Sequence, residues 1–554
     1  MYKNSFTAKH NPIFTLFILP AMLLSSCAGE SNNSNSIGEN APQVFQFNLS
    51  AEVTSLDPAF ADNQANTWAA VQLYNGLVRM NDQMQIEADL AESWEISEDG
   101  LSFLFELKPN ILFHPDQAFE GVEAERLLTA SDVVFSFKRL LDPELAADGS
   151  WIFADLIDPK TGFEVLSERS LKITLDHPFQ AFLSRLTMPY CSVVSKHATE
   201  FYNKEYRKNP VGTGPFKLTA WKEGEQLLLS KNKDYFRKDK DGNSLPYLDG
   251  VRMTFLNSKS TEFLQFENKD LDFVSDLDAS LMSRVLDNKG NLNADFAPKY
   301  KLIRGQYFNT EYLGFDLSSV PSGYQNQKVR QAINMGFDRK KMINSLRNGK
   351  GIPASGGMVP PVLLGVDHVK YGYKYNPQIA GQLLAEAGYP GAKGLPEITL
   401  RTNDQYLDLC SFIARQLQDI GIKVKTETVE GKILREWMVK GSAGFFRASW
   451  IVDYPDPESY LALFYSKHGA PPNYTRFNNA EFDVLYEEAI AQTDNLLRTK
   501  LYREMDSIVM SVSSVIPLYY DEILLLCQPN IEGLKPNPMN LLKLEEVRKN
   551  NPSN

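Results

Sequence analysis

The chain has 554 residues, which is more than one hydrophobic core usually supports, so we expect two or three domains. Its 43% hydrophobic and 23% charged residues are typical of globular proteins and exclude the disordered and fibrous classes. The net charge of −12, with no basic patch, argues against nucleic acid as a partner, because phosphate binding needs clustered cations.

The first residues have the pattern of a secretory signal peptide. Lys3 and Lys9 form the basic part, and the apolar run from Pro12 to Leu24 is too short to span a bilayer stably. The run ends in Leu24-Ser25-Ser26-Cys27, which resembles the bacterial lipobox, where cleavage before the cysteine leaves it as the lipid-modified first residue. We therefore expect lipidation of Cys27 and anchoring to a membrane.

The spacing of cysteine and histidine argues against metal and catalytic sites. Apart from the lipobox cysteine, Cys191, Cys410 and Cys527 lie far apart in apolar contexts, which favour three buried thiols over one disulfide and one thiol. The six histidines are scattered, and no H-E-x-x-H or G-x-S-x-G motif occurs. Asp453 and Asp456 could form a glycosidase couple, but carboxylates this close in a proline turn are more often structural. We expect no enzymatic activity, no metal and no cofactor.

The N-terminal region predicts strands and one capped helix. Residues 44–49 alternate apolar and polar side chains as a strand does, and residues 101–107 alternate again. A helix follows, with Thr129 or Ser131 as its N-cap. The intervening residues 117–126 predict an edge loop.

From Asn326 onward the pattern becomes α/β. Asn376 caps a helix that stops at Gly388, and a second helix over 409–417 precedes a strand over 422–428. Helical stripes follow over 482–490 and 497–508, and strands follow over 515–520 and 523–527. We expect the apolar stripes to form the core.

The segment from Arg447 to Glu458 carries the strongest functional signal. An apolar run predicts a strand that ends in an acidic, proline-stiffened corner at Asp453. In such a strand, one face carries Arg447, Ser449, Ile451 and Asp453, and the other carries Trp450 and Val452. An acid and a base on one face suit a zwitterion such as a peptide, with its ammonium at Asp453 and its carboxylate towards Arg447. The alternative is that Asp453 and Asp456 only make turn hydrogen bonds and that Arg447 is a solvated surface charge.

The same segment resembles a known family. Trp450, Asp453, Tyr454 and Pro457 form the W-x-x-D-Y-x-x-P pattern of extracellular solute-binding proteins of peptide and nickel ABC importers, most like the oligopeptide-binding members. Three N-terminal segments match this family in order and at similar spacing, 71–78, 89–94 and 97–100. The resemblance implies that Asp453 holds the α-ammonium of a peptide and that Arg447 meets its carboxylate. It also implies that Trp450 lines a side-chain pocket and that Tyr454 belongs to the ligand site.

The resemblance implies a mixed α/β and α+β fold. This is the two-lobed periplasmic-binding-protein fold, type II, in its large form with an extra N-terminal subdomain. The expected boundaries are a signal peptide over 1–26, a lipidated flexible tether over 27–42, lobe I over 43–78, 196–312 and 516–554, the extra subdomain over 79–195, and the ligand-binding lobe II over 313–515. Two crossings between lobes make a hinge, and a hinge makes a cleft that can close on a ligand.

These expectations describe an extracytoplasmic, periplasmic or cell-surface lipoprotein that is monomeric. It would capture di- to oligopeptides in the cleft and pass them to an ABC permease with its ATPase. Alternatives on the same fold are a nickel complex, haem or an oligosaccharide as ligand, or a sensing or adhesion role without transport. Asp453 and Arg447 favour a zwitterion, whereas sugar binding would depend on aromatic stacking.

Overall fold

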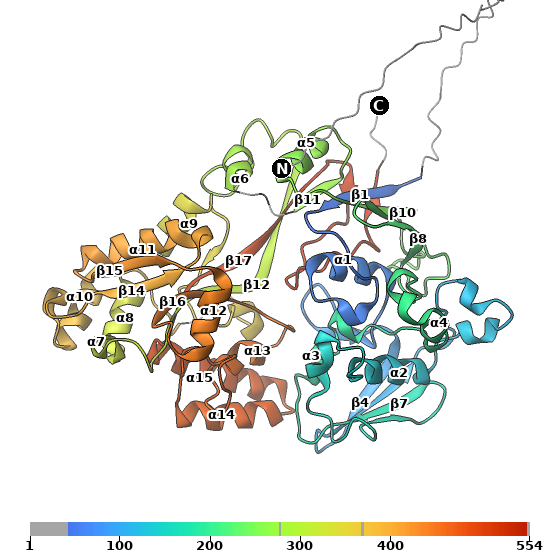
Figure 1. Ribbon diagram of the computed structural model, residues 1–554, viewed down its shortest axis with the longest axis horizontal. Helices are drawn as coiled ribbons and strands as arrows, with labels where there is room; N and C mark the ends of the chain where they lie inside the picture. The colour runs from blue at the N-terminus through green and yellow to red at the C-terminus, as the bar shows by residue number, and fades with distance from the viewer. Residues whose placement is uncertain (1–41, 276, 278, 367–369, 551–554) are drawn as a thin grey trace, which may run out of the picture. The chain divides into compact units, whose positions relative to one another are not determined.

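The computed structural model describes residues 42–275, 277, 279–366 and 370–550 (Figure 1). These residues belong to one compact unit that begins at Pro42. The predicted signal peptide, Cys27 and nearly all of the predicted tether lie outside the described residues. Within the described part, no helix has both the length and the apolar character needed to cross a bilayer.

A four-stranded sheet begins the described chain. Its order is β1 (Val44–Leu49), β10 (Gly250–Phe255), β9 (Gln226–Lys231) and β8 (Phe216–Lys222), with β1 parallel to β10 and the other pairs antiparallel. Phe47 packs against Trp68 of α1 (Gln64–Leu73), with ring centroids 5.9 Å apart. The predicted strand over 44–49 is confirmed, and its alternating apolar side chains form the buried face.

A second, antiparallel sheet follows with the order β4 (Ala91–Ile96), β5 (Ser102–Leu107), β7 (Ser170–Thr174) and β6 (Phe163–Val165). Near it lie the paired strands β2 (Val78–Met80) and β3 (Ile86–Ala88), and the helices α2 (Ala130–Leu140), α3 (Phe182–Arg185) and α4 (Lys196–Tyr202). Of the two predicted caps, Thr129 is the N-cap of α2, and its backbone N–H donates to the Asp132 carboxylate at 3.0 Å. The loop over 117–126 forms two short 3₁₀ turns.

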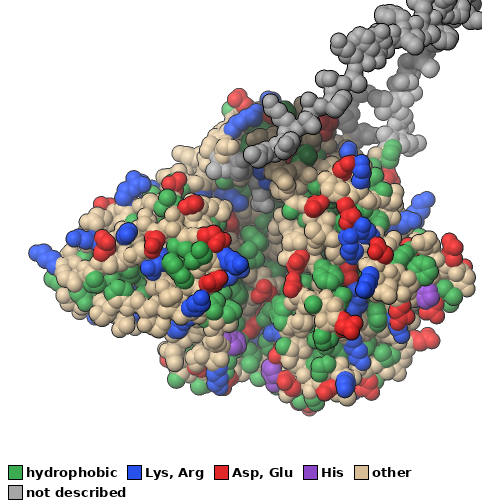
Figure 2. Space-filling view, viewed as in Figure 1, with side chains coloured by type: hydrophobic (Ala, Val, Ile, Leu, Met, Phe, Trp, Pro, Cys, Tyr) green, Lys and Arg blue, Asp and Glu red, His purple; other side chains and the backbone are tan. Residues whose placement is uncertain are grey.

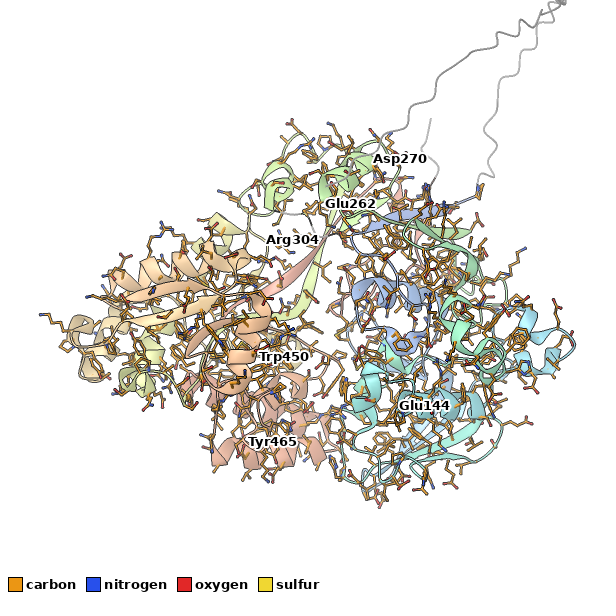
Figure 3. The ribbon with its side chains drawn as sticks, viewed as in Figure 1. Glu144, Glu262, Asp270, Arg304, Trp450 and Tyr465 are labelled. Carbon is orange, nitrogen blue, oxygen red and sulfur yellow. The ribbon has the colours of Figure 1, made fainter. Side chains whose placement is uncertain are left out.

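Two long strands connect the first part of the chain to the second. β12 (Lys301–Phe315) and β17 (Val515–Cys527) pair antiparallel, and β17 continues through the predicted break between residues 520 and 523. Their sheet has the order β11-β17-β12-β16-β14-β15, with β11 (Phe273–Ser275), β16 (Phe445–Ile451), β14 (Ile398–Thr402) and β15 (Val424–Thr428), while β13 (Ile352–Pro353) pairs with β17. The register of β12 against β17 shifts between Gln306 and Thr310, and such irregularities bend a strand. Close to this shift, Arg304 of β12 pairs with Glu522 of β17 at 2.6 Å (Figure 3).

The first four residues of β16, 445–448, are buried on both faces, because helices cover both sides of the sheet there. Phe445 stacks on Phe315 at 4.3 Å between centroids, in a core shared with α8 (Gln327–Met335), α9 (Arg339–Leu346), α10 (Pro377–Glu386) and α11 (Leu407–Asp419). The next residue, Phe446, belongs to a second core with α12 (Gly431–Lys440), α13 (Glu458–Leu461), α14 (Ala480–Ala491) and α15 (Asn495–Val512). A strand buried on both faces reads as a continuous apolar run.

The other helices and strands of the described chain are short. They are α5 (Lys259–Glu267), α6 (Ala279–Val285), α7 (Ser322–Gln325), β18 (Ile531–Glu532) and β19 (Arg548–Lys549). Cys191, Cys410 and Cys527 are buried free thiols, as their apolar contexts predict. Asn376 caps α10 as expected, because its side chain accepts a hydrogen bond from the N–H of Ile379 at 3.0 Å.

Candidate functional site

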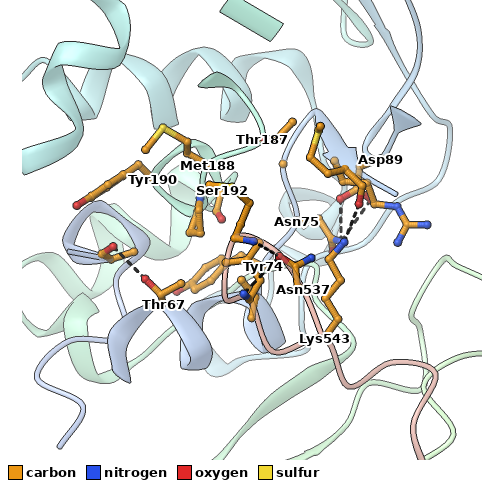
Figure 4. A pocket seen from close by; sticks show the side chains of 18 of the residues that line it. Thr67, Tyr74, Asn75, Asp89, Thr187, Met188, Tyr190, Ser192, Asn537 and Lys543 are labelled. Carbon is orange, nitrogen blue, oxygen red and sulfur yellow. Dashed lines mark hydrogen bonds between the residues drawn. The ribbon is translucent and has the colours of Figure 1, made fainter. Parts of the chain in front are cut away.

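A cavity of about 340 Å³ is lined by two groups of residues that lie far apart in the sequence (Figure 4). Most of the lining comes from the first part of the chain and from its C-terminal segment, including Tyr74, Asn75, Tyr190 and Lys543. The rest comes from Ile451 to Asp453 and from Pro455, at the end of β16. On the face that Figure 2 presents, the molecule is hollowed, and acidic side chains lie in the hollow. The volume falls in the range of roughly 300–1,000 Å³ that is usual for small-molecule sites.

Asp453 presents an unpaired carboxylate to this cavity. Among the described residues, its side chain accepts no hydrogen bond and forms no ion pair, although its backbone N–H donates to Ser459 Oγ at 3.3 Å. The carboxylate is open to the cavity, but the protein around it removes much of its hydration. This burial, followed by the charge of Glu458, raises its pKa to about 6, whereas Arg185 opposes the shift. An acid held in this way is suited to a cationic group of a ligand.

The corner around Asp453 is fixed by contacts to α13. The Trp450 Nε1–H donates to the backbone oxygen of Ser459 at 2.8 Å (Figure 3). The Asp456 carboxylate accepts the N–H of Glu458 at 3.0 Å and lies 3.6 Å from Arg498. The turn role that sequence reasoning offered for both aspartates therefore holds for Asp456, while the Asp453 side chain makes no such bond.

Tyr454 points away from the cavity. Its ring lies 6.2 Å from Trp151 and 5.4 Å from the Arg185 guanidinium, and its hydroxyl donates to the Glu458 carboxylate. Arg185 in turn pairs with Asp155 at 2.5 Å. Tyr454 thus joins the corner after β16 to the region of α3. Neither Tyr454 nor Trp450 lines the cavity, and their predicted roles in ligand binding stay predictions.

Arg447 lies apart from Asp453, in contrast to the expected shared groove. Its guanidinium pairs with Glu311 of β12 and lies 3.2 Å from the centroid of the Tyr406 ring. The side chains of Arg447 and Glu311 are only 9% and 1% exposed, and Arg447 does not line the cavity. The physical reason is strand pairing, which places β12 beside β16 and brings a buried carboxylate to the guanidinium. Its predicted contact with a ligand carboxylate stays a prediction.

A network of charges that sequence reasoning missed lies at another end of the cavity. Arg237 pairs with Asp89 at 2.5 Å and with Glu545 at 2.6 Å, and Arg79 also reaches Glu545 at 3.0 Å. Asn75 donates to the Asp89 carboxylate at 3.1 Å (Figure 4). Asn75 and Asp89 fall in the two segments, 71–78 and 89–94, that carry the family resemblance, so the sequence held a signal for them. No local pattern marks Glu545 or its neighbour Lys543.

The described residues contain no group of three or more His, Cys, Asp or Glu placed to hold a metal ion. The cavity offers apolar contacts, from side chains such as Met188 and Ile451, together with charge pairing and hydrogen bonding. It presents an unpaired carboxylate at Asp453 and a network of paired charges around Arg237.

The paired strands β12 and β17 join two parts of the chain, each built of helices and sheets, and segments from both parts line the cavity. This arrangement defines a two-lobed solute-binding protein. The chain belongs to the bacterial extracellular solute-binding proteins, family 5, whose middle-region model matches residues 85–472. Proteins of this family are the substrate-binding components of ABC importers. The predicted family and the two-lobed fold class are confirmed.

Individual relatives differ in what they bind. The chain is 29% identical to heme-binding protein A of Haemophilus influenzae over 94% of this chain and 95% of the relative. It is 26% identical to the oligopeptide-binding protein OppA of Bacillus subtilis, over 94% of this chain and 96% of that protein. The solved structure of HbpA2 from Haemophilus parasuis superposes with a TM-score of 0.80 at 24% identity, covering 92% of this chain and 100% of that one.

Proposed function

We propose that the protein captures peptides in the cavity lined by Asp453 and delivers them to an ABC permease. The observation that carries this proposal is the unpaired Asp453 carboxylate. If the lobes close and water leaves, an ionised carboxylate without a partner is unfavourable, and the ligand must supply a cation. The α-ammonium of a peptide is such a cation, and the relationship to an oligopeptide-binding protein supports this class of ligand.

Closure follows from the proposed lobe boundaries. The expected lobe II, over 313–515, begins within β12 and ends at the start of β17. Bending of these two strands near the register shift at Gln306 to Thr310 would move the Asp453 corner relative to the rest of the cavity lining. A peptide bound in extended form would then be enclosed and presented to the permease in one closed shape.

Acetylation of the peptide α-amine is expected to weaken binding to the unaltered protein strongly. It removes the ligand's positive charge and leaves Asp453 without a partner, so affinity should fall by roughly 30-fold or more. Calorimetry with alanine peptides of two to five residues, free and N-acetylated, measures this. Equal affinities would remove the main physical support for a peptide ligand. Haem or a nickel complex would instead be detected in the purified protein by its absorbance or metal content.

We also propose that Cys27 is lipidated and that the anchor holds the protein at a membrane. The sequence Leu24-Ser25-Ser26-Cys27 supports this. In cells grown with radiolabelled palmitate, the wild-type protein should carry label, and Cys27→Ala should carry none and remain unprocessed. Label retained by Cys27→Ala would show that the anchor is elsewhere.

A further inference from the structure

Lys543 lines the end of the cavity near Arg237, and among the described residues it has no carboxylate partner. It lies between Leu542 and Leu544, two buried residues of the core that contains β1 and α1. Its Nζ donates to the backbone oxygen of Met80 at 2.7 Å and forms no ion pair within the described chain. Burial lowers the pKa of Lys543, which indicates that its hydration is incomplete.

The acids near Lys543 are engaged by other cations. Asp89 and Glu545 pair with Arg237, and Glu545 also pairs with Arg79. The cations at this end are Arg79, Lys108, Arg237 and Lys543, and the carboxylates are Glu87, Asp89 and Glu545. Arg79 and Arg237 pair with these three carboxylates, whereas Lys543 forms no ion pair in the described part of the chain. Asp82, a further acid that acts on Lys543, is paired at 2.7 Å with Lys535, which also lies 3.4 Å from Glu546.

The other end of the cavity carries the unpaired carboxylate of Asp453. Tyr190 lines this end. Its pKa is raised to about 12, first by burial and then by the carboxylates of Asp62, Asp148 and Asp453. The titratable groups that act on Asp453 are Glu458 and Arg185. The charged residues near Tyr190 and Asp453 are not among those that shift the pKa of Lys543. In Figure 4, Tyr190 and Lys543 lie on opposite sides of the pocket.

We infer that Lys543 binds the α-carboxylate of a short peptide whose α-ammonium is bound by Asp453. This inference rests on the proposed peptide-binding function and narrows its ligand to peptides with both termini free. The ligand would lie along the cavity from Asp453 to Lys543, with opposite charges facing each other at both ends. A carboxylate gives Lys543 an acceptor of opposite charge, which the neutral backbone oxygen of Met80 does not supply, and ammonium–carboxylate hydrogen bonds are among the strong ones in proteins. The cavity thereby assigns the carboxylate to Lys543, where sequence reasoning assigned it to Arg447.

A double-mutant cycle tests the pairing. One partner is changed on the protein by Lys543→Gln, which keeps a donor for the oxygen of Met80, and the other on the ligand by replacing the C-terminal carboxylate with an amide. The probe is trialanine, and calorimetry measures all four combinations. The wild-type protein should prefer the free acid by roughly 10- to 100-fold, and Lys543→Gln should bind acid and amide within about threefold of each other. Lys543→Arg should restore most of the preference.

The control and the ligand arms separate the possible failures. Lys535→Gln changes a nearby lysine that is 54% exposed and paired with Asp82, and it should leave the preference for the acid unchanged. The comparison of acid with amide on the wild-type protein needs no variant, so misfolding cannot hide the result. The inference is overturned if the wild-type protein shows no preference for the free acid over the amide, or if Lys543→Gln keeps that preference. In either case, weaker binding of the N-acetylated peptide would still support the proposed function. If no alanine peptide of two to five residues binds, the inference and the proposed function both fall.

Discussion

Asp453→Ala is expected to weaken the binding of free peptides by roughly 30-fold to several-thousand-fold. Removing one partner of a desolvated, hydrogen-bonded charge pair costs about 2–5 kcal/mol, because the remaining charge is left without compensation. In this variant Asp62 and Glu458 remain as acids near this end of the cavity. Glu458 already accepts the hydroxyls of Tyr454 and Tyr486, and neither acid replaces the carboxylate at position 453. Calorimetry with trialanine and with its N-acetyl derivative measures the effect, and the variant should no longer distinguish the two ligands.

The ionisation of Asp453 adds a pH dependence to this prediction. Its pKa is raised from 3.8 to about 6, so in the ligand-free protein the carboxylate is charged above about pH 6 and neutral below it. Because an ammonium binds the charged form, the affinity of wild type should fall as pH decreases below 6, by up to about tenfold per pH unit. Both termini of the peptide keep their charge between about pH 4.5 and 6, so the ligand does not contribute.

Asp453→Asn is the matched control for this dependence. It keeps the size of the side chain and removes the titrating group, so its weak binding should be independent of pH over the same interval. A wild-type affinity that stays constant from pH 7.5 to 5 would contradict the assignment of Asp453 as the ammonium-binding group.

Arg447→Met is expected to destabilise the protein by about 3–5 kcal/mol, because it removes one partner of a buried ion pair. Glu311 is 1% exposed, burial raises its pKa, and Arg447 is the first of the charges that lower it. Without Arg447, the buried Glu311 carboxylate would have no ion-pair partner among the described residues. It would keep a long hydrogen bond from the Tyr519 hydroxyl, at 3.5 Å, and the influence of Arg347, which itself pairs with Asp521. The expected observation is a lower urea midpoint for unfolding, with a free energy of unfolding reduced by that amount.

Two further variants separate pairing from other causes. Arg447→Met combined with Glu311→Leu should recover most of the lost stability, because the uncompensated carboxylate is also removed. Lys222→Met breaks an exposed pair with Glu225, in which the side chains are 68% and 58% exposed, and should change stability by about 1 kcal/mol or less. An Arg447→Met protein as stable as wild type would contradict this reading. Loss of the preference for a free C-terminal carboxylate in Arg447→Met would show that Arg447 also contacts the ligand, as the sequence predicted.

Local patterns in the sequence predicted the elements that depend on neighbouring residues. The alternation over 44–49 became β1, and Asn376 capped α10 as expected, because side-chain periodicity and caps act within a few residues. The W-x-x-D-Y-x-x-P segment likewise identified Asp453, which does line the cavity. The family resemblance predicted the two-lobed fold, since its matching segments are spread along the chain.

The partners of charged side chains depended on contacts between residues far apart in the chain. The sequence placed Arg447 and Asp453 on one strand face, but it could not show that β12 would bring Glu311 to Arg447. Nor did it mark Lys543, which reaches the cavity because the C-terminal segment packs into the core that contains β1 and α1. By itself the sequence determined the family, the local elements and the acid at the end of β16. Only the tertiary structure decided which charges are already paired and which remain available to a ligand, because ion pairing depends on distances that strand pairing and packing set.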